Sequence, residues 1–190
     1  MDTSLTWLGR LVESPTGADW HRMVDVYAPL IHSWTLRAGV IDADREDLVQ
    51  EVLLVVVKRV KEFEREHPGA FRGWLRSILA NHLRNYYRKR PAGKCEFPLE
   101  GLTDPNSVLS KSLDREHDEH IVRQLMKLVE KDFKPTTWQA FREQVLEGRT
   151  PGDVAAELDV SLSVVIQSKY RVMQRLRQEF AGWFDRQNRE

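Results

Sequence analysis

The sequence predicts an all-α protein of two small helical domains joined by a flexible linker. Apolar residues recur at helical spacing through most of the chain, and no segment shows the sustained apolar–polar alternation of a half-buried strand. The helical pattern is interrupted between residues 91 and 110, where Pro, Gly, Ser and Asp are concentrated. That interruption divides the chain into an N-terminal and a C-terminal helical half.

The N-terminal half is expected to contain three helices, over residues 19–38, 42–64 and 71–90. Pro29 lies inside the first helix, where proline kinks or divides a helix, and Gly39 is a suitable end for it. The second helix begins with four acidic residues within residues 42–47, and the positive end of a helix dipole favours carboxylates. Pro91 ends the third helix.

The C-terminal half is expected to contain a helix-turn-helix. Thr150 has the chemistry of a helix cap, and Pro151 suits the first helical position. Counting from Pro151, a tight helix-turn-helix needs a small residue fifth, a residue that tolerates positive φ ninth and a branched apolar residue fifteenth. Ala155, Asp159 and Val165 occupy these places. Helices are therefore expected over residues 113–133, 138–146 and 151–158, and from Ser161 onward.

The formal net charge is zero, but many basic residues are concentrated in two segments. Residues 71–90 contain six basic residues and no acidic one, and residues 160–178 contain four basic residues and no acidic one. Two basic stripes on an otherwise acidic chain favour a polyanion that is bound at two places. Solvated helix faces have the same pattern, so charge alone leaves both interpretations open.

The composition excludes several classes of protein. No apolar run approaches the ~18 residues of a membrane span, and the N-terminus lacks the basic and apolar segments of a signal peptide. The single cysteine, Cys95, leaves no disulfide framework and no cysteine-based metal site. We therefore expect a cytoplasmic protein without a metal or cofactor. Nothing in the sequence gives a reason to expect a homo-oligomer.

The second helix is unusually apolar on one side. At 100° per residue, its apolar residues between Asp47 and Phe63 cover about 200°, whereas a stripe of about 100° is typical of a surface helix. Leu54 falls on the opposite, polar face. A helix wrapped by its own domain and a helix that also binds a partner both explain this pattern. The pattern alone slightly favours the first.

The two basic helices have the residue types of nucleic-acid-binding surfaces. The third helix interleaves aromatic and basic residues, as proteins that bind single-stranded nucleic acid do, although aromatic residues at helical spacing are more often core. The last helix carries polar donors followed by basic residues, which suits a helix in a DNA major groove. Val164, Val165 and Ile166 are consecutive there, so Val164 or Ile166 is partly exposed and able to contact a thymine methyl group.

Together these motifs resemble the extracytoplasmic-function sigma factors of bacterial RNA polymerase. The resemblance rests on Asp-Leu-Val-Gln-Glu-Val at residues 47–52, on Phe-Arg-Gly-Trp-Leu at residues 71–75 with the basic helix that follows, and on the helix-turn-helix. It implies that residues 1–92 (region two) bind the polymerase clamp and melt the minus-ten promoter element. It also implies that residues 93–112 are a linker, and that residues 113–190 (region four) read the minus-thirty-five element and dock on the flap.

Carried over by position, the resemblance implies three sets of binding residues. The polymerase clamp would be bound by Asp47, Gln50, Glu51, Leu54 and Lys58. In region two, promoter DNA would be bound by Arg72, Trp74, Arg76, Asn81, Arg84, Arg88 and Lys89. In region four it would be bound by Ser163, Val164, Gln167, Ser168, Lys169, Arg171 and Arg175. The implied partners are core RNA polymerase and promoter DNA, and the resemblance also admits an anti-sigma protein.

Two other functions compete with a sigma factor. A stand-alone helix-turn-helix regulator explains the C-terminal half but leaves residues 47–52 and the third helix without a role. An enzyme would need a catalytic site, and the acidic cluster at residues 42–51 lacks the central Gly of an EF-hand calcium loop. Binding to core RNA polymerase would separate the sigma factor, which is not an enzyme, from both alternatives.

Overall fold

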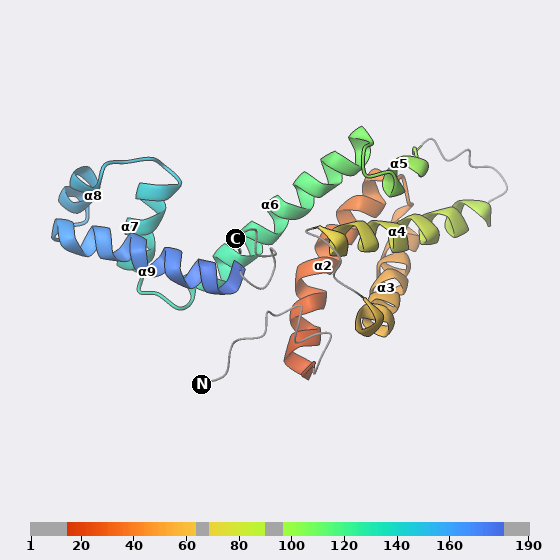
Figure 1. The fold of residues 1–190 in the computed structure, drawn as a ribbon, viewed down its shortest axis with the longest axis horizontal. Coiled ribbons are helices and arrows are strands. Elements are labelled where there is room, and N and C mark those ends of the chain that lie inside the picture. Colours follow the sequence, from red (N-terminus) through yellow and green to blue (C-terminus); the bar gives the residue numbers. More distant parts are fainter. Residues whose placement is uncertain (1–14, 64–68, 90–96, 181–190) are drawn as a thin grey trace, which may run out of the picture. The chain divides into compact units, whose positions relative to one another are not determined.

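The computed structural model describes residues 15–63, 69–89 and 97–180 (Figure 1). Within these ranges the chain forms eight α-helices, one short 3-10 helix and no strand, which confirms the all-α prediction. The described residues separate into two compact units, one up to Ile121 and the other from Val122 onward. None of the described helices is both long enough and apolar enough to cross a bilayer.

Unit 1 contains the three helices expected in the N-terminal half. It comprises α2 (Gly17–Arg37), α3 (Asp42–Arg59), the 3-10 helix η1 (Val60–Glu62), α4 (Ala70–Arg88), α5 (Glu100–Thr103) and the first half of α6 (Val108–Glu130). Helix α2 begins at a capping box, in which the Thr16 hydroxyl accepts from the Asp19 backbone at 3.3 Å and the Asp19 carboxylate accepts from the Thr16 backbone at 3.0 Å. It then continues through Pro29 without a break.

The core of unit 1 lies among α2, α3 and α4. Gly39 has a φ of 81° in the turn between α2 and α3, a conformation that suits glycine. On either side of this turn, the Arg45 guanidinium donates to the Val40 carbonyl at 2.9 Å and the Tyr87 hydroxyl donates to the Ala38 carbonyl. The fully buried side chains include Met23, Ile31, Trp34, Leu75, Leu79 and Leu83. These contacts fix the orientation of α3 and α4, and hence which of their side chains reach solvent.

The described end of the expected linker is folded onto unit 1. Helix α5 buries Leu102, which is 1% exposed. The Ser110 hydroxyl lies 2.8 Å from the Gly101 carbonyl and 3.1 Å from the Leu102 carbonyl, so the start of α6 is tied to α5. Residues 93–96 lie outside the described residues. Unit 1 therefore extends to Ile121, inside α6, and the domain boundaries expected from the sequence stay a prediction.

Unit 2 contains the expected helix-turn-helix. It comprises the second half of α6 with α7 (Pro135–Val145), α8 (Pro151–Glu157) and α9 (Leu162–Phe180). Thr150 caps α8 by accepting from the Asp153 backbone at 3.2 Å, and Asp159 has a φ of 50° in the turn, as predicted. Val154 and Val165 are fully buried against Ala140, with Ala155, Leu158 and Val160 packed around them.

Candidate nucleic-acid interface

The outer face of α3 carries the five residues expected to bind polymerase, and all five are exposed: Asp47, Gln50, Glu51, Leu54 and Lys58. Leu54 is 55% exposed, whereas its neighbour Leu53 is 7% exposed. The side chain of Glu51 lies 3.2 Å from His82 Nδ1 of α4, and the Gln50 amide donates to Glu46 at 3.3 Å. Leu54 is thus an apolar side chain surrounded by polar residues on a face that its own domain does not cover.

The wide apolar arc of α3 is largely covered by unit 1 itself. Val49, Val52 and Val56 are at most 2% exposed, and Val55 and Val57 are half-buried. The interpretation that the sequence pattern slightly favoured, a helix wrapped by its own domain, therefore accounts for the arc. It does not account for Leu54, which remains the exposed apolar residue of the helix.

Helix α4 exposes four of the residues expected to bind DNA along its second half: Asn81, Arg84, Arg88 and Lys89. The Arg84 guanidinium donates to the Asn81 side chain at 3.1 Å. Among the described residues, the ion pairs involve none of the three cations Arg84, Arg88 and Lys89. Their charges remain available to a polyanion.

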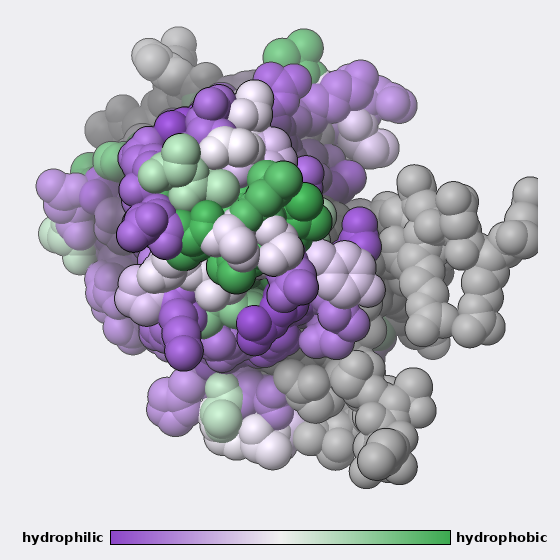
Figure 2. All heavy atoms as spheres, turned by 90° about the vertical axis from the view of Figure 1, so that its left-hand side faces the viewer, coloured by the Kyte–Doolittle hydropathy of each residue, from purple (hydrophilic) through white to green (hydrophobic). Residues whose placement is uncertain are grey.

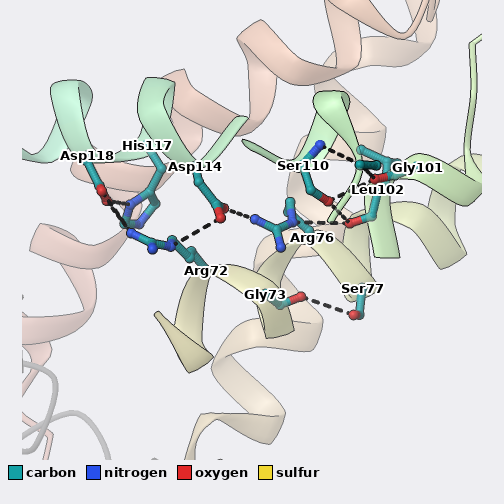
Figure 3. Close-up of polar contacts among 11 residues, drawn as sticks. Arg72, Gly73, Arg76, Ser77, Gly101, Leu102, Ser110, Asp114, His117 and Asp118 are labelled. Carbon is teal, nitrogen blue, oxygen red and sulfur yellow. Dashed lines mark hydrogen bonds and ion pairs between the residues drawn. The ribbon is translucent and has the colours of Figure 1, made fainter. Parts of the chain in front are cut away.

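The two arginines in the first half of α4 are instead engaged by α6 (Figure 3). Arg72 contacts the Asp118 carboxylate at 2.8 and 2.9 Å and Asp114 at 3.4 Å. Arg76 forms an ion pair with Asp114, and its Nε donates to the Leu102 carbonyl at 3.1 Å. Arg72 and Arg76, like Asp114 and Asp118, are four residues apart, so each pair lies on one face of its helix. The four residues form an ion-pair ladder between the two helices.

This ladder changes the role expected for Arg76. Its side chain is 4% exposed, and burial, together with the nearby charge of Arg72, lowers the pKa of its guanidinium. A charge at that depth is stabilised by Asp114 and the Leu102 carbonyl rather than by a ligand in solvent. We therefore regard Arg76 as a packing residue and leave it out of the DNA-facing set, while Arg72 keeps partial exposure beside its two carboxylates.

The ladder continues into a buried polar chain. His117 Nδ1 lies 3.0 Å from the Asp118 carboxylate, and its Nε2 lies 3.4 Å from the Tyr27 hydroxyl. Burial raises the pKa of Asp118, but the hydrogen bond from His117 and the charge of Arg72 outweigh burial, so its net pKa is lowered. Burial raises the pKa of the Tyr27 hydroxyl, which stays protonated. These contacts anchor the first half of α6 on α2 and α4.

Trp74 belongs to an aromatic cluster of unit 1. Its ring centroid lies 5.2 Å from that of Phe63 and 5.5 Å from that of Phe71, which in turn lies 5.4 Å from Tyr27. Such offset and tilted contacts stabilise packing beyond their buried area. Trp74 is half-buried, so one side of the ring packs and part of it reaches solvent.

Helix α9 exposes five of the seven residues that were expected to read DNA: Ser163, Val164, Gln167, Lys169 and Arg171. Ser168 is 4% exposed and its hydroxyl donates to the Val164 carbonyl at 2.8 Å, so it lies on the packed side of the helix. Arg175 pairs with Asp132 at 2.8 Å and with Glu179 at 2.6 Å. Ser168 is thus packed inside unit 2, whereas Arg175 is partly exposed and its charge is already paired with two carboxylates.

The outward surface of α9 also contains large apolar and aromatic residues outside the seven that were expected to bind DNA. Tyr170 is 64% exposed, Ile166 52% and Leu162 50%. Figure 2 shows apolar residues gathered at the end of unit 2 that faces left in Figure 1, within a polar surround. Tyr170 lies five residues after the buried Val165 and hence on the far side of the helix, so its exposure follows from helical spacing.

The acidic start of α3 does not assemble a metal site in the structure. Asp42 pairs with Arg45 at 2.5 Å. Within residues 15–63, 69–89 and 97–180, no group of three His, Cys, Asp or Glu side chains is placed to hold a metal ion. The carboxylates at this end are placed as N-terminal residues of a helix usually are.

Comparison with known proteins relates the chain to sigma factors. Residues 23–92 match the family described as sigma-70 region 2. The chain is 27% identical over 165 residues to the ECF RNA polymerase sigma factor SigE of Mycolicibacterium smegmatis. This alignment covers 85% of this chain and 62% of that protein. The chain thus spans less than two thirds of the length of this relative.

A solved structure is similar at a lower level. It is CnrH in complex with the cytosolic domain of CnrY, with 18% identity and a TM-score of 0.39 over 90% of this chain and 92% of that chain. At this TM-score, the likeness supports no inference about the function of this chain.

Proposed function

Because the chain contains a sigma-70 region 2 match at residues 23–92 and resembles extracytoplasmic-function sigma factors, we propose that it binds core RNA polymerase and directs it to promoters. The single observation that carries this proposal is the region 2 match, which covers α3 and α4. A helix-turn-helix follows it in unit 2, where a sigma factor carries its second promoter-reading module. Such a protein acts in the cytoplasm, binds no cofactor and catalyses no reaction itself.

The outer face of α3 is the proposed contact with the polymerase clamp. Leu54 supplies an apolar anchor, and Asp47, Gln50, Glu51 and Lys58 supply a polar surround. An exposed apolar centre with a polar rim has the composition of a binding hot spot. Because Glu51 is held beside His82, part of this surface is ordered before a partner binds.

The second half of α4 is the proposed contact with the melted minus-ten element. Arg84, Arg88 and Lys89 are exposed on a helix without acidic residues, and Asn81 lies beside Arg84. Cations of this kind meet phosphates, whereas a half-exposed ring such as Trp74 offers a surface for an unstacked base. DNA binding at this surface should therefore depend strongly on salt concentration, and the contribution of the arginines should depend little on the DNA sequence.

Helix α9 is the proposed reader of the minus-thirty-five element. Gln167 lies one turn after Ser163 and one turn before Arg171, and all three are exposed. An amide such as that of Gln167 bonds an adenine edge bidentately, whereas Arg171 is better placed for phosphate. Docking of unit 2 on the polymerase flap, and restraint by an anti-sigma protein, belong to the same proposal as expectations from the resemblance.

The alternative is a stand-alone helix-turn-helix regulator, which the geometry of α8 and α9 also favours. A pull-down of core RNA polymerase by the purified chain separates the two functions. A sigma factor retains the core enzyme without DNA, whereas a stand-alone regulator binds its operator and leaves the core enzyme in solution. Absence of core enzyme in the pull-down would overturn the proposal.

A further inference from the structure

The orientation of α9 is fixed by its buried side. Val165 and Val172 are fully buried, and Leu176 is 4% exposed. The Gln144 amide of α7 donates to the Val165 carbonyl at 3.0 Å and so holds the start of α9 in place. The ridge on the opposite side of the helix runs through Ser163, Ile166, Gln167 and Tyr170, all of which are exposed.

The centre of this ridge is apolar and aromatic rather than charged. Ile166 and Tyr170 are four residues apart, so they are neighbours on one face of the helix, separated by about one turn. Their exposed fractions are 52% and 64%. Val164 lies about 160° around the helix from Ile166, on the other flank. Residues 160–168 contain no charged residue. The first two turns of α9 up to Ser168 therefore present an uncharged, partly apolar ridge.

The charges around this ridge favour a polyanion as its occupant. Lys169 and Arg171 are exposed on either side of Tyr170. No acidic residue occurs between residues 160 and 178. Among the described residues, the ion pairs involve neither of these two cations. An apolar ridge between unneutralised cations matches a DNA major groove, where phosphates line the walls and thymine methyl groups lie on the floor.

We propose that Ile166 and Tyr170 read thymine methyl groups in the major groove, so that apolar contact contributes to the selection of the element by this helix. The proposal rests on the function proposed above. It assigns sequence selectivity to two residues that make none of the polar base contacts proposed there. The methyl group on C5 is the apolar feature that distinguishes thymine from the other bases in that groove. Ser163 to Tyr170 spans about 10 Å along the helix, so the ridge reaches about three base-pair steps.

The test uses the full chain assembled with core RNA polymerase. Binding of the chain to core RNA polymerase is measured first, by co-elution. If the two do not co-elute, the proposed function is wrong, and this result is distinct from a failure of the thymine-methyl proposal. The holoenzyme then selects its upstream element from a randomised duplex library. In the selected duplex, thymines are replaced one at a time by deoxyuridine, which lacks only the methyl group. We expect about fourfold weaker binding for each thymine that faces the pair.

Three variants assign the effect to residues. Ile166→Ala and Tyr170→Ala should each remove the sensitivity to deoxyuridine at one position, with an unchanged unfolding midpoint because both side chains are exposed. Tyr170→Phe keeps the ring and should keep the sensitivity. Arg171→Ala is the matched control, which weakens binding to both duplexes by the same factor.

Two results would overturn the proposal. One is binding that stays unchanged when deoxyuridine replaces thymine at each position of the selected element, or a selected element that contains no thymine. The other is deoxyuridine sensitivity that persists unchanged in both alanine variants. If those variants lose affinity for a protein partner instead, the ridge is a protein docking surface and not a base reader.

Discussion

Replacing Leu54 by aspartate tests the proposed contact between α3 and the polymerase clamp. Leu54 is 55% exposed, so its removal takes away little core packing and should change the free energy of unfolding by no more than about 0.5 kcal/mol. An apolar anchor of an interface contributes about 2 kcal/mol or more to binding. We therefore expect Leu54→Asp to weaken core polymerase binding about 30-fold or more, because 1.4 kcal/mol corresponds to a tenfold change.

Leu36 provides a matched control on α2. It is the same residue type with the same exposed fraction, 55%, and it lies outside the proposed interface. Leu36→Asp should leave both the unfolding midpoint and the affinity for core polymerase unchanged. Affinities are measured by competition of each variant with labelled wild-type chain for a limiting amount of core enzyme. Equal affinity of folded Leu54→Asp and wild type would remove Leu54 from the interface.

Four further outcomes follow from the structure. Arg76→Ala should lower the free energy of unfolding by about 1.5–3 kcal/mol in urea titration, because Asp114 loses one of its two arginine partners and keeps only Arg72. Arg84→Ala should leave stability unchanged and reduce the magnitude of the slope of log affinity against log salt by about 0.7, the value for a phosphate of a single strand, and an unchanged slope would exclude a phosphate contact. Asp118→Asn should destabilise the chain near neutral pH. Since the pKa of Asp118 is lowered in the folded state, this difference should begin to shrink as the pH falls below about 4 and should disappear once the pH lies below the lowered pKa; a difference that does not shrink with falling pH would refute the assignment. Gln167→Ala should relax base preference at one or two positions at a cost of about 1–3 kcal/mol, which selection from a randomised library would detect.

The helices and the helix-turn-helix could be predicted from the sequence because they depend on local chemistry. The positive φ at Asp159, the buried Val165 and the cap at Thr150 all follow from residue types at fixed spacing. The exposure of Leu54 follows from its position on a helical wheel. The same wheel places Ser168, three residues after Val165, on the packed side, so its burial was available from the sequence as well.

The ion-pair ladder between α4 and α6 could not be predicted in the same way. Arg72 and Asp118 are 46 residues apart in the chain, and helical spacing does not say which face of which helix they meet. A basic stripe looks the same whether its cations meet solvent, phosphate or a second helix. The structure separates the stripe on α4 into a packed first half, with Arg76 buried, and an exposed second half, with Arg84 and Arg88 free of ion pairs within the described residues.

Transcription from a promoter library by core RNA polymerase, with and without the purified chain, tests the central claim most directly. The measured quantity is the position of each transcript start, determined by sequencing RNA 5′ ends. The account predicts that adding the chain produces starts at a fixed distance downstream of a shared pair of sequence elements, and that Leu54→Asp abolishes these starts while Leu36→Asp does not. Starts that are distributed as with the core enzyme alone would contradict the account.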